Sequence, residues 1–214
     1  MSGSIVTPET RSRIRGLATP VAVFFGRLGL SPNALTLIGF GIAIVAAFAA
    51  AAQSWLLAGL LVVFGGVFDL FDGALARATG KASRLGAFMD SVFDRWGEGV
   101  IYVGIAWGCV AADYAIGAVL ATAALMSAFM VSYARAKSEG LGFTEDTGMA
   151  AVGLAPREVR IVILTVGLIL AGTLGANNQN GLAFTLGLIT ILATITVIQR
   201  IVHVLRQPPP EENQ

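Results

Sequence analysis

The sequence predicts an all-α integral membrane protein, with six transmembrane helices preceded by an N-terminal interfacial amphipathic helix. Hydrophobic residues make up 56% of the 214 residues, charged residues only 13%, and the mean hydropathy is +0.78. A soluble domain carries roughly a quarter charged residues. A helix needs about 20 apolar residues to cross a bilayer core of about 30 Å. Six segments meet or approach this length: 32–52, 55–76, 87–112, 115–137, 158–175 and 181–203.

The N-terminal region, residues 1–30, is expected to lie in the cytoplasm and to carry the interfacial helix. Its stretch 8–26 places Arg11, Arg13 and Arg15 before an apolar cluster. This stretch is too short and too charged to span a bilayer. It fits a juxtamembrane helix that lies along the membrane surface, with its arginines towards the lipid headgroups. An unstructured tail is the alternative.

Residues 31–206 are expected to form one six-helix domain, followed by a disordered tail at 207–214. Ser31 is suited to cap the first crossing helix. Pro32 is suited to the first helical position, where its missing N–H costs nothing. The tail reads QPPPEENQ and is the one low-complexity segment of the sequence.

The basic residues indicate how the helices are oriented. All fourteen Lys and Arg residues lie near the two chain ends or in the stretches 77–95 and 135–160. The opposite turns, near 53–54, 113–114 and 174–181, contain none. Positively charged loops stay on the cytoplasmic side. We therefore expect a multi-pass protein of the plasma membrane with both termini in the cytoplasm.

The composition also excludes some kinds of site. The chain has one cysteine, Cys109, and one histidine, His203. A disulfide within the chain and a four-ligand Cys/His zinc site are therefore excluded. Cys109 lies in an apolar run and is interpreted as a small packing residue. The net charge is only +1, and no nucleic-acid partner is expected.

Four aspartates interrupt the second and third apolar segments. Asp69 and Asp72 are three residues apart, and Asp90 and Asp94 are four apart. Each pair therefore lies on one face of its helix. The connection between these two antiparallel helices is short, so both pairs are expected near the cytoplasmic surface, where they can face each other.

Carboxylates inside a membrane require compensation. A charged side chain near the bilayer centre costs roughly 2.5–3.5 kcal/mol on insertion scales, and like charges repel each other. Oxygen-only ligands favour hard divalent cations such as Mg²⁺ or Mn²⁺. Four carboxylates can hold two such ions about 4 Å apart. The sequence therefore favours a two-metal site formed by Asp69, Asp72, Asp90 and Asp94.

The aspartates also admit two roles without a catalytic metal site. They could form structural salt bridges with Arg77, Arg84 and Arg95. Aspartates could also line the pathway of a divalent-metal transporter. Against transport, the four acids cluster near one membrane face, and the outer halves of the helices hold no ionisable residue except Asp113.

Glycines and an arginine beside the aspartates indicate a pyrophosphate-containing substrate. Gly73 follows Asp72 directly, and Gly86 lies four residues before Asp90. Missing side chains at these positions would let a ligand approach the backbone. Arg77 lies about one helical turn beyond Asp72, where its guanidinium could contact a phosphate.

These residues together match a family pattern. The stretch 69–94 fits D-x2-D-G-x2-A-R-x8-G-x3-D-x3-D without a gap. It resembles the CDP-alcohol phosphatidyltransferases, and the six-helix plan extends the resemblance over nearly the whole chain. The matching residues are Asp69, Asp72, Gly73, Ala76, Arg77, Gly86, Asp90 and Asp94.

The resemblance implies transfer of a phosphatidyl group from CDP-diacylglycerol to an alcohol, with release of CMP. It assigns the four aspartates to two metal ions, and it makes Asp94 the general base that deprotonates the attacking hydroxyl. The metal ions would stabilise the charge on the departing CMP. A homodimer embedded in membrane lipids is also expected, because relatives are often dimers. The residues implied in binding the nucleotide are Pro32, Asn33, Gly73, Ala76, Arg77 and Gly86.

Further basic residues on the same side suit an acceptor that is itself a phosphate ester. The segment SYARAK at 132–137 resembles an element of bacterial phosphatidylinositol phosphate synthases, which implies inositol phosphate as the acceptor. Glycerol phosphate or another polar alcohol is the alternative acceptor. Ordinary cytoplasmic positive charge is the alternative explanation for any single one of these residues. The candidates for the acceptor phosphate are Ser132, Arg135, Lys137, Arg157, Arg160 and Arg200.

Overall fold

The described part of the chain consists of helices joined by short connections. The computed structural model describes residues 20–143, 149, 152–174 and 179–207, and these residues contain no strand. The all-α prediction is therefore confirmed for this part of the chain. Its long helices are α2 (Pro32–Ala51), α3 (Trp55–Ala78), α4 (Arg84–Ala111), α5 (Ala115–Gly140), α6 (Arg157–Thr173) and α7 (Gln179–Leu205).

Two serines fix the starts of the helices that matter most for the site. The Ser31 hydroxyl accepts a hydrogen bond from Ala34 N at 3.2 Å, and Pro32 begins α2 as expected. The Ser83 hydroxyl accepts from Gly86 N at 3.0 Å and caps α4 in the same way. These bonds satisfy backbone N–H groups that have no partner within the helix.

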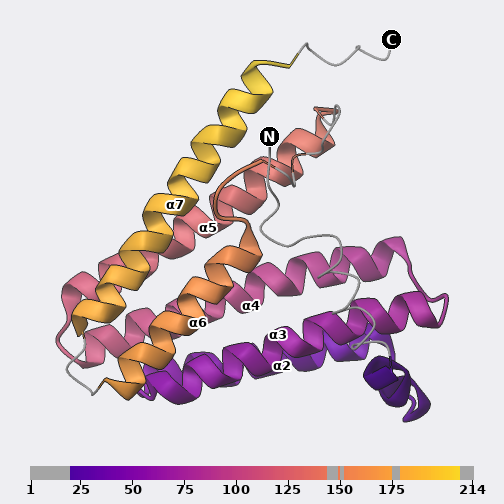
Figure 1. The fold of residues 1–214 in the computed structure, drawn as a ribbon, viewed down its shortest axis with the longest axis horizontal. Coiled ribbons are helices and arrows are strands. Elements are labelled where there is room, and N and C mark those ends of the chain that lie inside the picture. Colours follow the sequence, from indigo (N-terminus) through magenta and orange to yellow (C-terminus); the bar gives the residue numbers. More distant parts are fainter. Residues whose placement is uncertain (1–19, 144–148, 150–151, 175–178, 208–214) are drawn as a thin grey trace.

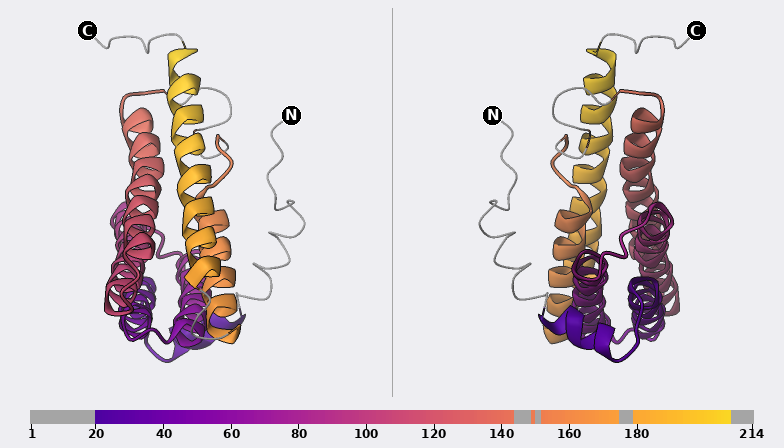
Figure 2. Two further views of the ribbon diagram at one scale, coloured as in Figure 1. Left: turned by 90° about the vertical axis from the view of Figure 1, so that its left-hand side faces the viewer. Right: turned by 90° about the vertical axis from the view of Figure 1, so that its right-hand side faces the viewer.

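The helices form two groups that meet at one end of the molecule. The end of α2 and start of α3, the end of α4 and start of α5, and the end of α6 and start of α7 all lie at the lower left of Figure 1. From there α2, α3 and α4 run one way and α5 and α7 another, so the groups diverge (Figure 1, Figure 2). The main packed pairs are α2 with α3 and α4, α5 with α4 and α7, and α6 with α3 and α7.

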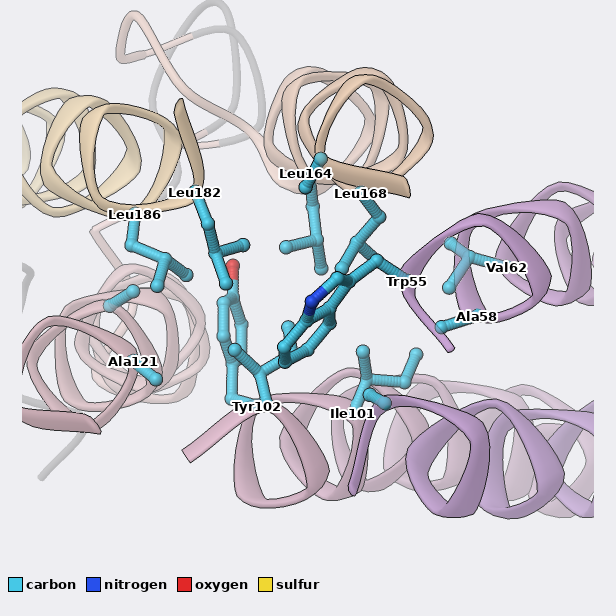
Figure 3. Packing of buried hydrophobic residues seen from close by; sticks show 14 of the residues in the cluster. Trp55, Ala58, Val62, Ile101, Tyr102, Ala121, Leu164, Leu168, Leu182 and Leu186 are labelled. Atoms are coloured by element: carbon cyan, nitrogen blue, oxygen red, sulfur yellow. The ribbon is translucent and has the colours of Figure 1, made fainter. Parts of the chain in front are cut away.

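The largest apolar core lies where these groups meet. Trp55 of α3 and Tyr102 of α4 lie next to Leu164 and Leu168 of α6 and Leu182 of α7 (Figure 3). Cys109 belongs to the same core and is 1% exposed, which agrees with its interpretation as a packing residue.

Small residues let the helices approach closely in this region. A side chain at Gly104 of α4 would overlap the backbone of Ala47 of α2, and one at Gly172 of α6 would overlap the backbone of Leu56 of α3. Close backbone approach is how helices associate in lipid, where the hydrophobic effect does not drive them together. The glycines therefore serve packing here.

The surface of the helices is that of a multi-pass membrane protein. Large apolar side chains stand exposed on several helices, for example Phe48, Trp107 and Phe184, which are 72%, 68% and 72% exposed. By length and composition, α2, α3, α5 and α7 can each cross a membrane. Two predicted spans do not meet this test, because α4 carries several charged residues and α6 has only 17 residues.

The predicted interfacial helix at 8–26 lies mostly outside the described residues. Its last part falls in a helical segment at 20–27. Ala22 and Phe25 of this segment pack against Leu35 of α2 and Leu75 of α3. Of the predicted tail at 207–214, only Gln207 lies within the described residues.

Candidate active site

The four aspartates lie on two helices, and a third helix packs against both. Asp69 and Asp72 are on the last part of α3, and Asp90 and Asp94 are on the first part of α4. α2 packs against both of these helices, whereas α3 and α4 are not extensively packed against each other. Side chains from other helices therefore complete the site between them.

Thr36 of α2 holds one of the α3 aspartates. Its hydroxyl donates to Asp72 Oδ2 at 2.7 Å, and Asp72 is only 4% exposed. A hydrogen bond to a charged group is worth roughly 1.5–3 kcal/mol, and a buried carboxylate without a partner is costly. Thr36 therefore fixes the position of the Asp72 carboxylate.

Arg157, the first residue of α6, joins the two helices that carry the aspartates. Its Nη2 donates to Asp69 Oδ2 at 3.0 Å, and its Nη1 lies 3.0 Å from Asp94 Oδ2. Arg95 makes a longer contact of 3.5 Å from its Nη1 to the same oxygen of Asp94. The Arg157 guanidinium thus bridges Asp69 and Asp94 and offsets their mutual repulsion.

The aspartates suit a divalent cation by their chemistry, but they are not gathered around one point. Within the described residues, no three Asp, Glu, His or Cys side chains lie close enough together to hold a metal ion. The four carboxylates offer only hard oxygen ligands. A cation already lies between Asp69 and Asp94, because the guanidinium of Arg157 is there. The four carboxylates therefore fit a divalent ion by their chemistry, and Arg157 supplies positive charge to two of them.

The predicted structural salt bridges are only partly present. Of Arg77, Arg84 and Arg95, only Arg95 forms an ion pair with an aspartate in the described part of the chain. The shorter contacts to the aspartates come from Arg157, which the sequence suggested for the acceptor phosphate instead.

Gly73 and Ala76 keep one face of α3 free of large side chains near Asp72. Arg77 folds back over Gly73, since a Cβ added to Gly73 would lie 3.2 Å from Arg77 Nη1. Ala76 on the same part of the helix is half-buried, and Arg77 is exposed. A flexible exposed guanidinium above a residue without a side chain is suited to contact a phosphate.

The starts of α2 and α4 come together on the other side. Asn33 follows Pro32 at the start of α2, and a Cβ added to Gly86 would lie 3.4 Å from Asn33 Oδ1. The same Cβ would lie 3.1 Å from Ser83 Oγ. Sequence-distant residues of the proposed nucleotide set, Asn33 and Gly86, are therefore neighbours.

Arg160 lies one helical turn beyond Arg157 and has different surroundings. It is 0% exposed, and its Nε and Nη2 donate to the two carboxylate oxygens of Glu98 at 2.9 and 2.8 Å. Its Nη1 donates to Ala155 O at 3.0 Å. This fork-to-fork pair ties α6 to α4 with every nitrogen of the guanidinium engaged.

The other acceptor candidates lie on α5 and α7. Arg200 is 3% exposed, and it donates from Nε to Val152 O at 3.0 Å and from Nη1 to Val131 O. Arg135 pairs with the exposed Glu139 at 2.9 Å. Of the remaining two candidates on α5, Lys137 is exposed and Ser132 is half-buried.

Three contacts at the site were not predicted from the sequence: Thr36 with Asp72, Glu98 with Arg160, and Arg157 with the aspartates. Glu98 did carry a signal, because it lies four residues after Asp94 and so shares its helix face. An ionisable residue inside a transmembrane segment implies a partner. Nothing in the sequence identified that partner as Arg160.

The comparison with protein families agrees with this site. The model of the CDP-alcohol phosphatidyltransferase family matches residues 29–205. The chain belongs to this family, and it is a membrane enzyme of that class. The family resemblance drawn from residues 69–94 is thereby confirmed over most of the chain.

Relatives with curated names are similar over almost their whole length. An archaetidylinositol phosphate synthase of Pyrococcus horikoshii is 37% identical over 92% of this chain and 94% of its own. A phosphatidylinositol phosphate synthase of Mycobacteroides abscessus is 31% identical over 98% of this chain and 90% of its own. The phosphatidylinositol phosphate synthase of Streptomyces avermitilis is 34% identical over 95% of this chain and 84% of its own.

Solved structures share the fold. The phosphatidylinositol phosphate synthase of Mycobacterium tuberculosis with CDP-DAG bound has a TM-score of 0.81 and 25% identity, covering 92% of this chain and 98% of that one. The same enzyme with manganese and citrate has a TM-score of 0.81 and 25% identity, covering 92% and 93%.

Proposed function

We propose that this protein transfers the phosphatidyl group of CDP-diacylglycerol to inositol phosphate, giving phosphatidylinositol phosphate and CMP. The observation that carries this proposal is the complete family signature at 69–94, with Asp69 and Asp94 turned towards the same guanidinium. The names of the relatives support inositol phosphate as the acceptor, because each names a synthase of an inositol phosphate lipid. The solved complex with CDP-DAG supports the donor.

Two divalent ions, Mg²⁺ or Mn²⁺, would be held by Asp69, Asp72, Asp90 and Asp94. The oxygen-only donor set and the manganese complex of the solved relative support divalent metal use. Bound ions would supply charge stabilisation for the pyrophosphate as CMP departs.

Asp94 would act as the general base. Its side chain is 14% exposed, so an acceptor hydroxyl can reach it, and Arg157 and Arg95 both contact its Oδ2. It would accept the proton of the acceptor hydroxyl, whose oxygen forms the new bond to the lipid-linked phosphorus. The bond between that phosphorus and the CMP oxygen breaks, and CMP carries the electron pair away.

The nucleotide would lie against the adjoining ends of α2, α3 and α4. The missing side chain at Gly73 and the exposed guanidinium of Arg77 next to it support a contact with the diphosphate. The proximity of Asn33 to Gly86 supports a contact with the same ligand from α2 and α4. The full set proposed for the nucleotide is Pro32, Asn33, Gly73, Ala76, Arg77 and Gly86.

The acceptor phosphate would lie near the start of α6 and the ends of α5 and α7. Arg157, Arg135 and Lys137 have exposed surface from which a phosphate can be reached. Arg160 and Arg200 are almost fully buried and already bonded, so we infer that they contribute positive potential and hold helices in place. The full set proposed for the acceptor is Ser132, Arg135, Lys137, Arg157, Arg160 and Arg200.

In the membrane, we propose six crossings, with both termini and the aspartates on the cytoplasmic face of the plasma membrane. The helix ends next to the three turns without Lys or Arg lie together at one end of the molecule (Figure 1), and this supports the orientation. The N-terminal segment would lie along the cytoplasmic surface, and two chains would form a homodimer.

The test is an activity measurement on purified protein. CDP-diacylglycerol and Mg²⁺ or Mn²⁺ are supplied, and CMP release is measured with inositol phosphate, glycerol phosphate or free inositol. We expect release that requires inositol phosphate and falls by at least about a hundredfold in Asp94→Asn, the lower end of what a general base contributes. CMP release only with another acceptor would support phosphatidyl transfer but reject inositol phosphate as the acceptor. No release with any acceptor would favour the transporter alternative.

A further inference from the structure

The Arg157 guanidinium lies between two carboxylates that a divalent ion would use. It contacts Oδ2 of Asp69 and Oδ2 of Asp94, each at 3.0 Å. These two carboxylates belong to the proposed metal site. A divalent ion bound to the same oxygens would take the lone pairs that the guanidinium now uses, and it would repel the guanidinium at contact distance. Arg157 and the metal therefore compete for the same two side chains.

The surroundings of the Arg157 side chain would allow its guanidinium to move away from the two aspartates. Its Nε is buried without a hydrogen-bond partner, although both terminal nitrogens contact carboxylates. Its side chain is 25% exposed, so it has room on one side. A buried N–H without a partner is costly, and movement towards a phosphate would give this group a new acceptor.

The helix behind Arg157 stays in place when the side chain moves. One turn further along α6, Arg160 is locked to Glu98 by two hydrogen bonds and to Ala155 by a third. The Arg157 side chain therefore moves from a fixed anchor, and the positions it can reach are limited to those near the start of α6.

We propose that Arg157 is an internal counter-ion that the divalent metal displaces, and that the displaced guanidinium then binds the acceptor phosphate. Before metal binds, the guanidinium neutralises Asp69 and Asp94. After metal binds, the same positive charge becomes available to a second ligand. Metal binding must therefore precede tight binding of the acceptor. The second half of this proposal rests on the proposed function, while the displacement itself does not.

The displacement is tested without any substrate. Mn²⁺ binding to the purified protein is measured by electron paramagnetic resonance, for the wild type, Arg157→Gln and Arg157→Lys. We expect Arg157→Gln to bind Mn²⁺ about tenfold more tightly, because no charge-assisted contact has to be broken first. Arg157→Lys should lie between the two, because lysine keeps the charge but cannot bridge two carboxylates with a planar fork.

Arg95→Gln is the matched control. It removes one positive charge from the same carboxylate, but its contact is 3.5 Å long and reaches only Asp94. We expect its Mn²⁺ affinity to stay within about threefold of the wild type. Equal or weaker Mn²⁺ binding in Arg157→Gln, or an equal change in Arg95→Gln, would overturn the displacement.

A second measurement uses the unaltered chain. Phenylglyoxal modifies accessible guanidinium groups, and the modified fraction at Arg157 is read by peptide mass spectrometry with and without Mn²⁺. Displacement predicts more modification of Arg157 with Mn²⁺, while the fully buried Arg160 stays unmodified in both samples. Unchanged or reduced modification of Arg157 would overturn the proposal.

The link to the acceptor is tested by equilibrium binding. Inositol phosphate is titrated into the wild type by calorimetry with Mn²⁺ present and after its removal by chelation. Affinity at least tenfold higher with Mn²⁺, and lost in Arg157→Gln, supports the link. Metal-independent binding would overturn it. If Arg157→Gln binds Mn²⁺ more tightly but the wild type binds no inositol phosphate, the displacement is supported and inositol phosphate is rejected as the acceptor. Failure of the displacement and failure of the proposed function are therefore distinguishable.

Discussion

Two arginines one turn apart on α6 show two different uses of the same side chain. Arg160 is fully buried, and all its nitrogens are engaged by Glu98 and by Ala155 O. Arg157 is a quarter exposed, bridges Asp69 and Asp94, and leaves Nε without a partner. Arg160 faces one acid within the core, whereas Arg157 faces two acids at a site.

The difference shows which positively charged side chain of this membrane protein another cation can replace. A buried pair that is completely hydrogen-bonded loses much when one partner is removed, and no ligand can replace that partner. A partly exposed cation between two carboxylates can be replaced by another cation of similar position. The comparison therefore predicts that metal does not restore the stability lost in a Glu98 variant, whereas metal does restore the stability lost in an Arg157 variant.

The largest effect is expected at Glu98. Glu98→Ala should lower the free energy of unfolding by about 3–5 kcal/mol, because it leaves the Arg160 guanidinium buried without its counter-charge. Chemical unfolding in detergent micelles measures this loss, and added Mn²⁺ should not restore it. Replacing both residues by methionine should recover most of the stability, since no charge is then buried. A loss of less than about 1 kcal/mol in Glu98→Ala would remove the contrast with Arg157.

The next effect concerns Arg157. Arg157→Gln should lower the free energy of unfolding of the metal-free protein by about 2–3 kcal/mol, because two charge-assisted hydrogen bonds are lost and two carboxylates face each other unscreened. Saturating Mn²⁺ should restore most of this loss. Unfolding of the same sample with chelator and with Mn²⁺ is the measurement. A loss that Mn²⁺ leaves unchanged would place Arg157 with Arg160 as a purely structural residue.

A smaller effect is expected at Thr36. Thr36→Val removes the hydroxyl that donates to Asp72 at 2.7 Å and keeps the shape of the side chain. It should cost about 1–2 kcal/mol of stability and reduce CMP release several-fold, because the Asp72 carboxylate loses its fixed position. Thr36→Ser keeps the hydroxyl and should retain most of the activity. Equal activity of the valine and serine variants would show that Asp72 is held without this bond.

The smallest effect is expected at an exposed pair. Arg135 and Glu139 lie 2.9 Å apart on the surface of α5, with side chains 42% and 37% exposed. Glu139→Gln should change the free energy of unfolding by less than about 0.5 kcal/mol, because exposed pairs on one helix contribute little. Unfolding measured beside the Glu98 variant provides the comparison. A loss above about 1 kcal/mol would mean that α5 depends on this pair.

The fold was largely predictable because hydrophobic length is a strong signal. Each apolar segment became a helix whose bounds lie within a few residues of the prediction, and Ser31 and Pro32 begin α2 as expected. The crossing count was harder. Charges along α4 and the shortness of α6 blur the transmembrane signal in those two helices.

The aspartates were predictable as a group, but their partners were not. Spacing places Asp69 with Asp72, and Asp90 with Asp94, because helix periodicity is local. The contacts from Thr36 and Arg157 depend on which helices pack together, and residues distant in sequence carry no local sign of that. The pairing of Arg160 with Glu98 likewise depends on how the helices pack, because the two residues lie on α6 and α4.

The buried position of Cys109 makes the chain convenient for site-directed spectroscopy. It is the only cysteine in the sequence, and its thiol is packed in the core at 1% exposure. A spin label or fluorophore that reacts with accessible thiols will therefore find no native target in the folded protein. A cysteine introduced for Lys81, on the exposed connection between α3 and α4, would be labelled alone and would report on the aspartate-bearing helix ends during turnover.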